Sequence, residues 1–263
     1  MDLHLDNKRS LVTGSTAGIG FAIAEALARE GASVIINGRS QQSVDDAIGK
    51  LRARVNGKLT GYAGDLASDA VAEKLFREHP DVDILVNSLG IFEPAPFEQI
   101  PDADWRRFFE INVLSGVRLS RLYLPGMKQR NWGRIIFISS ESGVQIPPEM
   151  IHYGMSKAAQ IAIARGLAES VAGTGITVNS ILPGPTRSRG VVDFVGRIAK
   201  EKGMSFDEFE AAFIEEMRPS SVIKRFATTE EIASLVAYVA SPLASATTGA
   251  ALRVDGGVIR SAF

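Results

Sequence analysis

The 263-residue chain contains no cysteine and only three histidines. The absence of cysteine excludes disulfides, thiolate nucleophiles, iron-sulfur clusters and thiolate zinc sites. The histidines, at positions 4, 79 and 152, are too scattered to suggest a metal cluster. We therefore expect chemistry that uses no metal.

An excess of charge of either sign is also absent, since 29 Lys and Arg oppose 30 Asp and Glu, for a net charge of -1. Without a basic stripe there is no general electrostatic attraction to nucleic acid or to anionic membranes. No apolar run approaches the roughly 18 residues of a membrane span, and the stretch from Met1 to Ser10 has no hydrophobic signal core. We expect a cytoplasmic protein that binds neither nucleic acid nor membrane.

Short β-branched runs alternate along the chain with longer stretches of helical period. This alternation predicts an α/β fold, a single Rossmann-type domain over 1–263 with a doubly wound parallel sheet of about seven strands flanked by helices. The expected strands are 10–13, 33–37, 59–63, 84–87, 134–139, 177–181 and 251–254. The expected helices are 19–30, 44–55, 69–78, 104–130, 156–171 and 230–240.

One segment, from Pro183 to Arg225, leaves this alternation for a long, charged excursion with helices expected at 191–200 and 205–217. Long insertions in compact domains tend to be lids or binding loops, so we expect a helical substrate lid at about 186–225. Its expected apolar underside comprises Phe194, Ile198, Phe206, Phe209, Phe213, Ile214 and Met217. Its basic ends, Arg187, Arg189, Arg218, Lys224 and Arg225, could hold cofactor phosphates or select an anionic substrate. The alternative is a pair of static surface helices.

A glycine-rich turn, T-G-S-T-A-G-I-G over 13–20, follows the first expected strand and runs into a helix. Glycines there let the backbone turn tightly and approach a pyrophosphate, whose charge lies at the helix N-terminus. A plain tight turn is the alternative. The candidate cofactor-binding residues of this turn are Gly14, Thr16, Gly18, Ile19 and Gly20.

The second expected strand ends in I-N-G-R-S, where an NAD enzyme would place a carboxylate on the ribose 2′-OH. Gly38 leaves room at that point, and Arg39 offers a guanidinium suited to a 2′-phosphate. The sequence therefore favours NADP(H), with NAD(H) as the other cofactor to consider. The alternative for Arg39 is a solvated charge at a strand end.

Tyr153 and Lys157 lie four residues apart, which places a phenol and an ammonium on one helix face. The ammonium should lower the pKa of the phenol, so that Tyr153 can give or take a proton near neutral pH. Ser140 ends an apolar strand, and its hydroxyl should meet Tyr153 at the carboxyl edge of the sheet.

From Ser10 to Gly257 the chain resembles the short-chain dehydrogenase/reductase family, whose pattern pairs T-G-x-x-x-G-x-G with Y-x-x-x-K. The resemblance implies that Tyr153 is the acid/base, that Ser140 orients the substrate and that Lys157 also holds the nicotinamide ribose. Asn112 corresponds to an asparagine that positions a water in the proton relay. Further cofactor contacts are implied for Asp65, Leu66, Asn87, Gly90, Pro183, Gly184, Thr186 and Ser188.

Several positions depart from the family pattern. Ala17 stands where many NADP-preferring members carry a basic residue, and N-S-L-G at 87–90 replaces N-N-A-G, so that Leu89 should narrow the space near the cofactor. The Arg residues that acyl-carrier-protein reductases place before the glycines at 133 and 175 are missing, although Arg130 and Arg134 lie close by. Asp65 also has another interpretation, as a cap before the helix near Ser68.

These observations predict an NADP(H)-dependent oxidoreductase that transfers hydride to or from a small-molecule carbonyl or secondary alcohol. The alternative is an NAD(P)-binding sensor or regulatory protein without turnover. A hydrolase is disfavoured because the chain has no G-x-S-x-G motif. The resemblance also implies a homo-oligomer, a tetramer in our expectation, because the helices expected at 104–130 and 156–171 carry more apolar positions than one sheet face needs.

Overall fold

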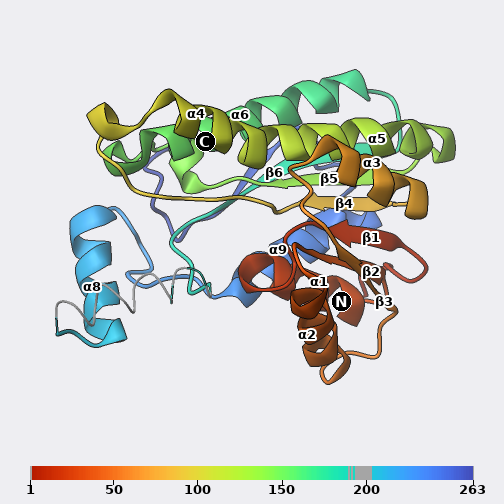
Figure 1. Ribbon diagram of the computed structural model, residues 1–263, viewed down its shortest axis with the longest axis horizontal. Helices are drawn as coiled ribbons and strands as arrows, with labels where there is room; N and C mark the ends of the chain where they lie inside the picture. The colour runs from red at the N-terminus through yellow and green to blue at the C-terminus, as the bar shows by residue number, and fades with distance from the viewer. Residues whose placement is uncertain (1, 189, 191, 193–202, 263) are drawn as a thin grey trace.

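The computed structural model describes residues 2–188, 190, 192 and 203–262. Its seven strands form one parallel sheet in the order β3-β2-β1-β4-β5-β6-β7 (Figure 1). The strands are β1 (Arg9–Val12), β2 (Ser33–Gly38), β3 (Leu59–Ala63), β4 (Ile84–Asn87), β5 (Gly133–Ile138), β6 (Ile176–Pro183) and β7 (Ala251–Val254). The predicted doubly wound, seven-stranded Rossmann-type sheet is therefore confirmed.

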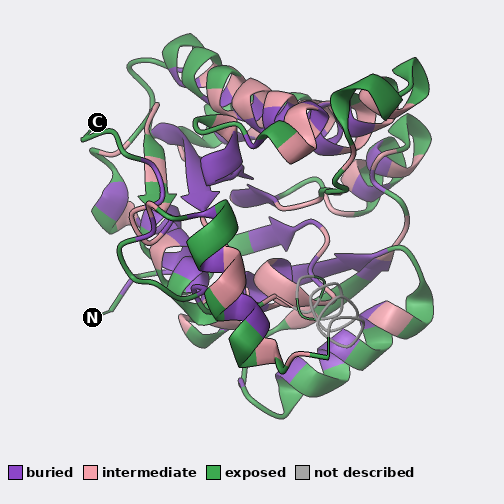
Figure 2. Cartoon of the chain, turned by 90° about the vertical axis from the view of Figure 1, so that its left-hand side faces the viewer, coloured by how far each residue is buried: buried purple, intermediate pink, exposed green. Residues whose placement is uncertain are grey.

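Helices cover the sheet on both faces, so the central strands are buried on both sides (Figure 2). One face is packed by α1 (Gly18–Arg29), α2 (Gln41–Arg52) and α9 (Thr229–Ala240). The other is packed by α3 (Asp69–Glu78), α5 (Ser115–Arg130) and α6 (Ile151–Ser170). These two apolar layers explain why I-L-V in β4 and I-I-F-I in β5 read as continuous hydrophobic runs rather than as alternating ones.

Strand register brings the loops that carry function to a common edge. Val12, the last residue of β1, pairs with Ile36 of β2 and with Val86 of β4, so the ends of these three strands lie within two residues of one another. In an open parallel sheet ligands bind at the carboxyl ends, where the strand order reverses. Here that point lies between β1 and β4, which are adjacent although two strands separate them in sequence.

The helix predicted over 104–130 is divided in the structure. It comprises α4 (Asp102–Phe108), a π-helical stretch (Phe109–Leu114) and α5. The expected start of the next helix at 156 is also wrong, because α6 begins at Ile151. Met150 at its N-cap provides no capping side chain, so the usual start signal is missing from the sequence.

The excursion contains α8 (Phe206–Met217), which matches the helix predicted over 205–217 and begins with a capping box between Ser205 and Glu208. Figure 1 shows α8 set apart from the layered body. The helix predicted at 191–200 lies outside the described residues apart from Val192, as do Arg189, Phe194 and Ile198.

The remaining described elements are short 3-10 turns at Phe97–Gln99, Glu141–Gly143, Pro148–Met150 and Pro242–Ala244. None of the helices in the described ranges combines the length and apolar character needed to cross a bilayer.

Candidate active site

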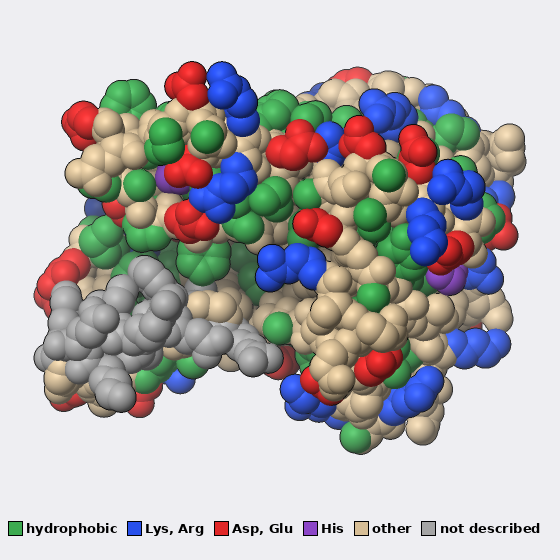
Figure 3. All heavy atoms as spheres, in the orientation of Figure 1, with side chains coloured by type: hydrophobic (Ala, Val, Ile, Leu, Met, Phe, Trp, Pro, Cys, Tyr) green, Lys and Arg blue, Asp and Glu red, His purple; other side chains and the backbone are tan. Residues whose placement is uncertain are grey.

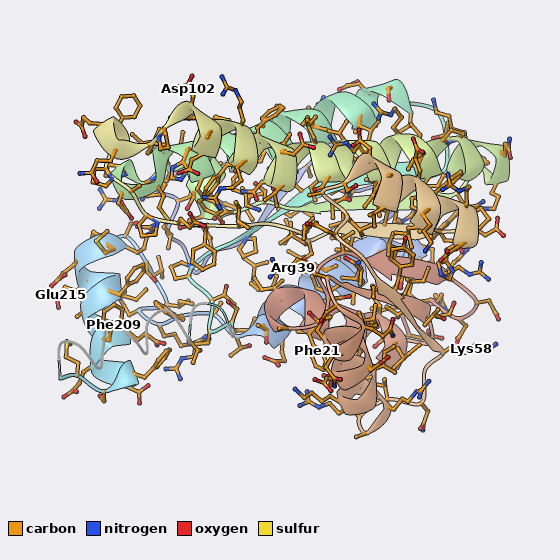
Figure 4. All side chains as sticks on the ribbon, in the orientation of Figure 1. Phe21, Arg39, Lys58, Asp102, Phe209 and Glu215 are labelled. Atoms are coloured by element: carbon orange, nitrogen blue, oxygen red, sulfur yellow. The ribbon has the colours of Figure 1, made fainter. Side chains whose placement is uncertain are left out.

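A cavity of about 660 Å³ opens at the carboxyl edge of the sheet, between the glycine turn and α8. Hydrophobic side chains line the hollow on the left of Figure 3. Figure 4 shows that Phe209 points from α8 toward the body of the molecule, whereas Glu215 points away from it. The apolar face of α8 therefore forms one wall, contributing Phe209, Phe213 and Met217.

The glycine turn has a backbone that only glycine adopts easily. Gly14 and Gly18 have φ angles of 61° and 59°, in the left-handed region. A Cβ on Gly20 would lie 2.5 Å from the carbonyl oxygen of Gly14. The N-cap of α1, Ala17, makes no side-chain capping bond, and the first turn holds no acidic residue. The amide groups at this helix start thus suit an anion, and the turn fits a pyrophosphate.

Two buried polar residues that the sequence did not single out hold this turn. Oδ1 of Asn37 accepts from the amide of Gly14 at 3.1 Å, and its Nδ2 donates to the carbonyls of Tyr62 and Gly64. Oγ1 of Thr13 accepts from the amides of residues 88 and 89, both at 2.9 Å. A polar side chain at the end of an apolar strand is the sequence signal that could have indicated both roles.

The expectation that Gly38 leaves room for a ligand is wrong. A Cβ at Gly38 would lie 2.4 Å from Cγ2 of Thr16, so the glycine turn already fills that space. Arg39 follows it as an exposed residue, beside α1 in Figure 4. No partner for its guanidinium occurs in the described part of the chain. Gly38 thus excludes a carboxylate by close packing, and Arg39 remains available to an anion.

Asp65 and Leu66, two of the implied cofactor contacts, have local structural roles. Oδ1 of Asp65 accepts from the amide of Ala67 at 3.0 Å, and its carbonyl accepts from the amide of Ser68. Leu66 is buried in the core. These contacts agree with the alternative stated for Asp65, which is a cap of the turn before α3.

The predicted catalytic side chains come together at the floor of the cavity. Tyr153 is hydrogen-bonded to Ser140. Nζ of Lys157 lies 5.6 Å from the centre of the Tyr153 ring and donates to the carbonyl of Ile138 at 2.9 Å. Ser140, Tyr153 and Lys157 all line the cavity. A hydroxyl, a phenol and an ammonium therefore face one space, as proton transfer to a carbonyl oxygen requires.

The expected effect of Lys157 on Tyr153 is not found. Burial, followed by the negative charge of Glu141, raises the pKa of Tyr153 above its ordinary value of 10.0. Burial also lowers the pKa of Lys157 to about 8. The ammonium is directed at a carbonyl and an amide rather than at the phenol, so burial outweighs its attraction for a phenolate.

Asn112 lies in the π-helical stretch and is fully buried. Its Oδ1 accepts from the amide of Ile91 at 2.8 Å, while its Nδ2 donates to Oγ of Ser156 at 2.9 Å. Its carbonyl accepts from Nε2 of Gln160 at 2.6 Å, and Oε1 of Gln160 accepts from Nζ of Lys157 at 3.2 Å. Gln160 thus bridges Asn112 and Lys157 with two hydrogen bonds. The sequence did not indicate this residue.

Most of the other predicted cofactor contacts also border the cavity. The lining residues among them are Gly14, Gly18, Ile19, Gly20, Gly90, Pro183, Gly184, Thr186 and Ser188. Asn87 does not line the cavity: its side chain is buried, and its Nδ2 donates to Oγ of Ser120 at 3.3 Å. The cofactor contact expected of Asn87 stays a prediction, and its side chain turns into the core. Thr16, Arg39, Asp65 and Leu66 lie outside the cavity as well.

The basic ends of the excursion are already paired with acidic side chains or carbonyls. Arg187 bonds to Glu210 at 2.7 Å and to Asp207 at 3.1 Å. Arg225 pairs with Glu231 at 2.7 Å, and Lys224 donates to a backbone carbonyl. Arg218 pairs with Glu141 and Glu149. The expectation that these described groups are available to select an anionic substrate is therefore not supported.

The chain resembles known proteins over nearly its whole length. Residues 14–259 match the profile of a family described as Enoyl-(Acyl carrier protein) reductase. The chain is 48% identical to the uncharacterized oxidoreductase YvaG of Bacillus subtilis, over 100% of both chains. It is 34% identical to D-beta-hydroxybutyrate dehydrogenase of Cupriavidus necator, over 96% of this chain and 98% of that one.

A solved structure of L-sorbose reductase from Gluconobacter frateurii, complexed with NADPH and L-sorbose, superposes with a TM-score of 0.92. The two sequences are 31% identical, and the match covers 99% of this chain and 100% of the reductase. The likeness therefore extends over nearly the whole chain.

Proposed function

The chain is an oxidoreductase of the short-chain dehydrogenase/reductase family, and from this premise we propose that it interconverts a carbonyl compound and a secondary alcohol with NADP(H). The observation that carries the proposal is the meeting of Ser140, Tyr153 and Lys157 in one cavity that the phosphate-binding turn also borders. A sensor needs the turn but has no use for a phenol and an ammonium at the same place.

The proposed chemistry divides between cofactor and chain. The glycine turn would hold the pyrophosphate of NADPH, which would supply the hydride for the carbonyl carbon and become NADP+. Tyr153 donates the proton that the carbonyl oxygen needs, because its phenol is protonated at neutral pH. Ser140 positions the phenol of Tyr153 through their hydrogen bond, and Lys157 holds the floor of the site through Ile138 and Gln160. Alcohol oxidation uses the same groups, with Tyr153 accepting the proton.

The preference for NADP(H) rests on residues 38 and 39. A carboxylate at position 38 would collide with Thr16, and Arg39 presents a guanidinium that has no partner among the described residues. A guanidinium forms charge-assisted, bidentate bonds with a phosphate. The sorbose reductase that this chain resembles was crystallised with NADPH, which is consistent with this choice.

We infer that the substrate is uncharged and largely apolar. Apolar side chains of α8 form the wall of the cavity, while Glu141, Glu149 and Glu216 also line it. Its described basic side chains are Lys157 and Arg218, and Arg218 is already bonded to two of those carboxylates. A substrate carboxylate would meet more negative than positive charge among these residues.

We further propose that the protein is a cytoplasmic homo-oligomer and that the segment from 186 to 225 covers the substrate. A groove lined by Val117, Leu124, Ile163 and Leu167 runs between α5 and α6, and a second copy could bury these apolar side chains. The mass measured by light scattering at micromolar concentration should exceed the 28.2 kDa of one chain.

The deciding experiment mixes the purified protein with NADPH or NADH and follows the absorbance of the reduced nicotinamide. The carbonyl panel should pair neutral ketones with keto acids of similar size, and the reverse reaction should be run with the corresponding alcohols. Turnover of neutral ketones with NADPH supports the proposal. Tight binding of NADPH without turnover on the whole panel would support the sensor alternative instead.

A further inference from the structure

A buried ion pair connects the catalytic serine to the end of α8. Oγ of Ser140 donates to Oε2 of Glu141 at 2.5 Å, and Nε of Arg218 donates to Oε1 of the same carboxylate at 3.0 Å. The side chains of Arg218 and Glu141 are only 7% and 6% exposed. Arg218 also donates to Glu149 at 3.3 Å and to the carbonyl of Met217 at 2.7 Å. The proton relay just described makes no use of this pair.

The contact with Glu141 determines which way the Ser140 hydroxyl points. A serine hydroxyl has one proton, and a carboxylate only accepts. With that proton given to Glu141, the Ser140 oxygen can only accept from Tyr153. The phenol must then donate, so the hydrogen bonds run from Tyr153 to Ser140 to Glu141.

The groups around Tyr153 shift its pKa in opposite directions. Burial is the largest influence and raises the pKa, as does the negative charge of Glu141, whereas the hydrogen bond with Ser140 and the charge of Arg218 lower it. Lys157 lies across the ring on α6, and Glu149 faces the same space from the turn before that helix. Glu141 is the acidic group of this set that is also hydrogen-bonded to Ser140.

We propose that Glu141, held in place by Arg218, is a positioning residue that takes the Ser140 proton and thereby keeps Tyr153 in the proton-donating form that carbonyl reduction needs. This inference rests on the proposed function, and it adds a reaction direction: near neutral pH the site is prepared for reduction. Alcohol oxidation requires Tyr153 to lose its proton first, so it should gain speed at alkaline pH.

The test measures ionisation of Tyr153 in the full chain by tyrosinate absorbance, taking the difference between each protein and its Tyr153→Phe counterpart. In Glu141→Gln the Tyr153 signal should appear about one pH unit or more lower than in wild type. The rate of oxidation relative to reduction at pH 7 should rise about tenfold, since one pH unit is a factor of ten. Glu149→Gln is the matched control: it removes a charge from the same Arg218 without touching Ser140, and its shift should be smaller.

The double variant Glu141→Gln/Arg218→Gln provides a second measurement, because it leaves no unpaired buried charge that could prevent folding. The tyrosinate absorbance of Tyr153 in this double variant should still appear at a lower pH than in wild type. An unchanged or higher midpoint in the variants that lack Glu141 overturns the proposal, and so does an equal shift in Glu149→Gln. Because the titration needs no turnover, an inactive wild type would count against the proposed function alone.

Discussion

The floor of the cavity and its α8 wall are built in different ways. The floor stands on fully buried strands, and its polar groups are bonded to backbone, as when Lys157 donates to Ile138. The α8 wall has a small apolar cluster of its own, with Phe209, Ile214 and Phe226 at its centre. It is joined to the floor by the ion pair between Arg218 and Glu141. The difference suggests that the floor determines the chemistry and the wall determines the substrate.

The difference also bears on stability. Residues in the two large clusters pack on both faces of the sheet, so their loss should unfold the whole molecule. The α8 cluster is small and lies to one side of the layers (Figure 1). Changes in α8 should therefore alter substrate affinity before they alter folding. The predictions below test this division, beginning with the largest expected effect.

Tyr153→Phe should reduce kcat for ketone reduction by about a thousandfold, because it removes the proton donor and little volume. The Kd for NADPH, measured by fluorescence titration, should stay within about twofold of wild type. Tyr238→Phe, at an exposed site on α9, is the matched control. Comparable activity in the two variants would mean that the floor does not supply the acid/base.

Lys157→Met should abolish turnover and change how stability depends on pH. The folded pKa of Lys157 is about 8, below its ordinary value of 10.5, so the unfolded chain binds more protons between these values. This group therefore destabilises wild type below about pH 8, and the penalty disappears as pH rises toward 10.5. The free energy of unfolding of the variant relative to wild type should fall by about 3 kcal/mol from pH 7 to pH 10.5 in urea titrations. A difference independent of pH would contradict the lowered pKa.

Arg39→Ala should raise the KM for NADPH by roughly thirtyfold while the KM for NADH changes less than about threefold, because only NADPH carries the 2′-phosphate. Initial rates with each cofactor at saturating ketone measure both constants. Arg52→Ala removes another exposed Arg, at the end of α2, and serves as control. If the KM values for NADPH and NADH rise equally, the Arg39 guanidinium does not bind the 2′-phosphate.

Phe209→Ala should raise the KM for a neutral ketone by about tenfold, since the ring forms part of the apolar wall. The Kd for NADPH should change little, because the glycine turn lies across the cavity. Glu215→Ala on the outer face of the same helix is the control (Figure 4). If Phe209→Ala raises the Kd for NADPH more than the KM for the ketone, α8 contacts the cofactor rather than the substrate. The proposed separation of roles between floor and wall would then be wrong.

Much of the site could be predicted from the sequence because its residues belong to short motifs with fixed geometry. The four-residue spacing of Tyr153 and Lys157 places both on one face of any helix. Position 140, at a strand end, had to fall at the carboxyl edge once the sheet was parallel. Gln160 could not be found in this way, because its role depends on a π-helical stretch that begins 51 residues earlier, at Phe109.

Hydrophobic periodicity and strand-end motifs by themselves determined the seven-stranded sheet and its helical layers, and they predicted that Ser140, Tyr153 and Lys157 share one site, because those patterns are local and their geometry is fixed. Tertiary structure alone decided which polar groups pair. In the folded chain Thr16 occupies the space beside Gly38, the side chain of Asn87 is bonded to Ser120 in the core, and Arg218 is paired with Glu141. It also raised the pKa of Tyr153 when the neighbouring motif suggested the opposite. Burial and charge pairing depend on residues distant in sequence, and no local spacing records them.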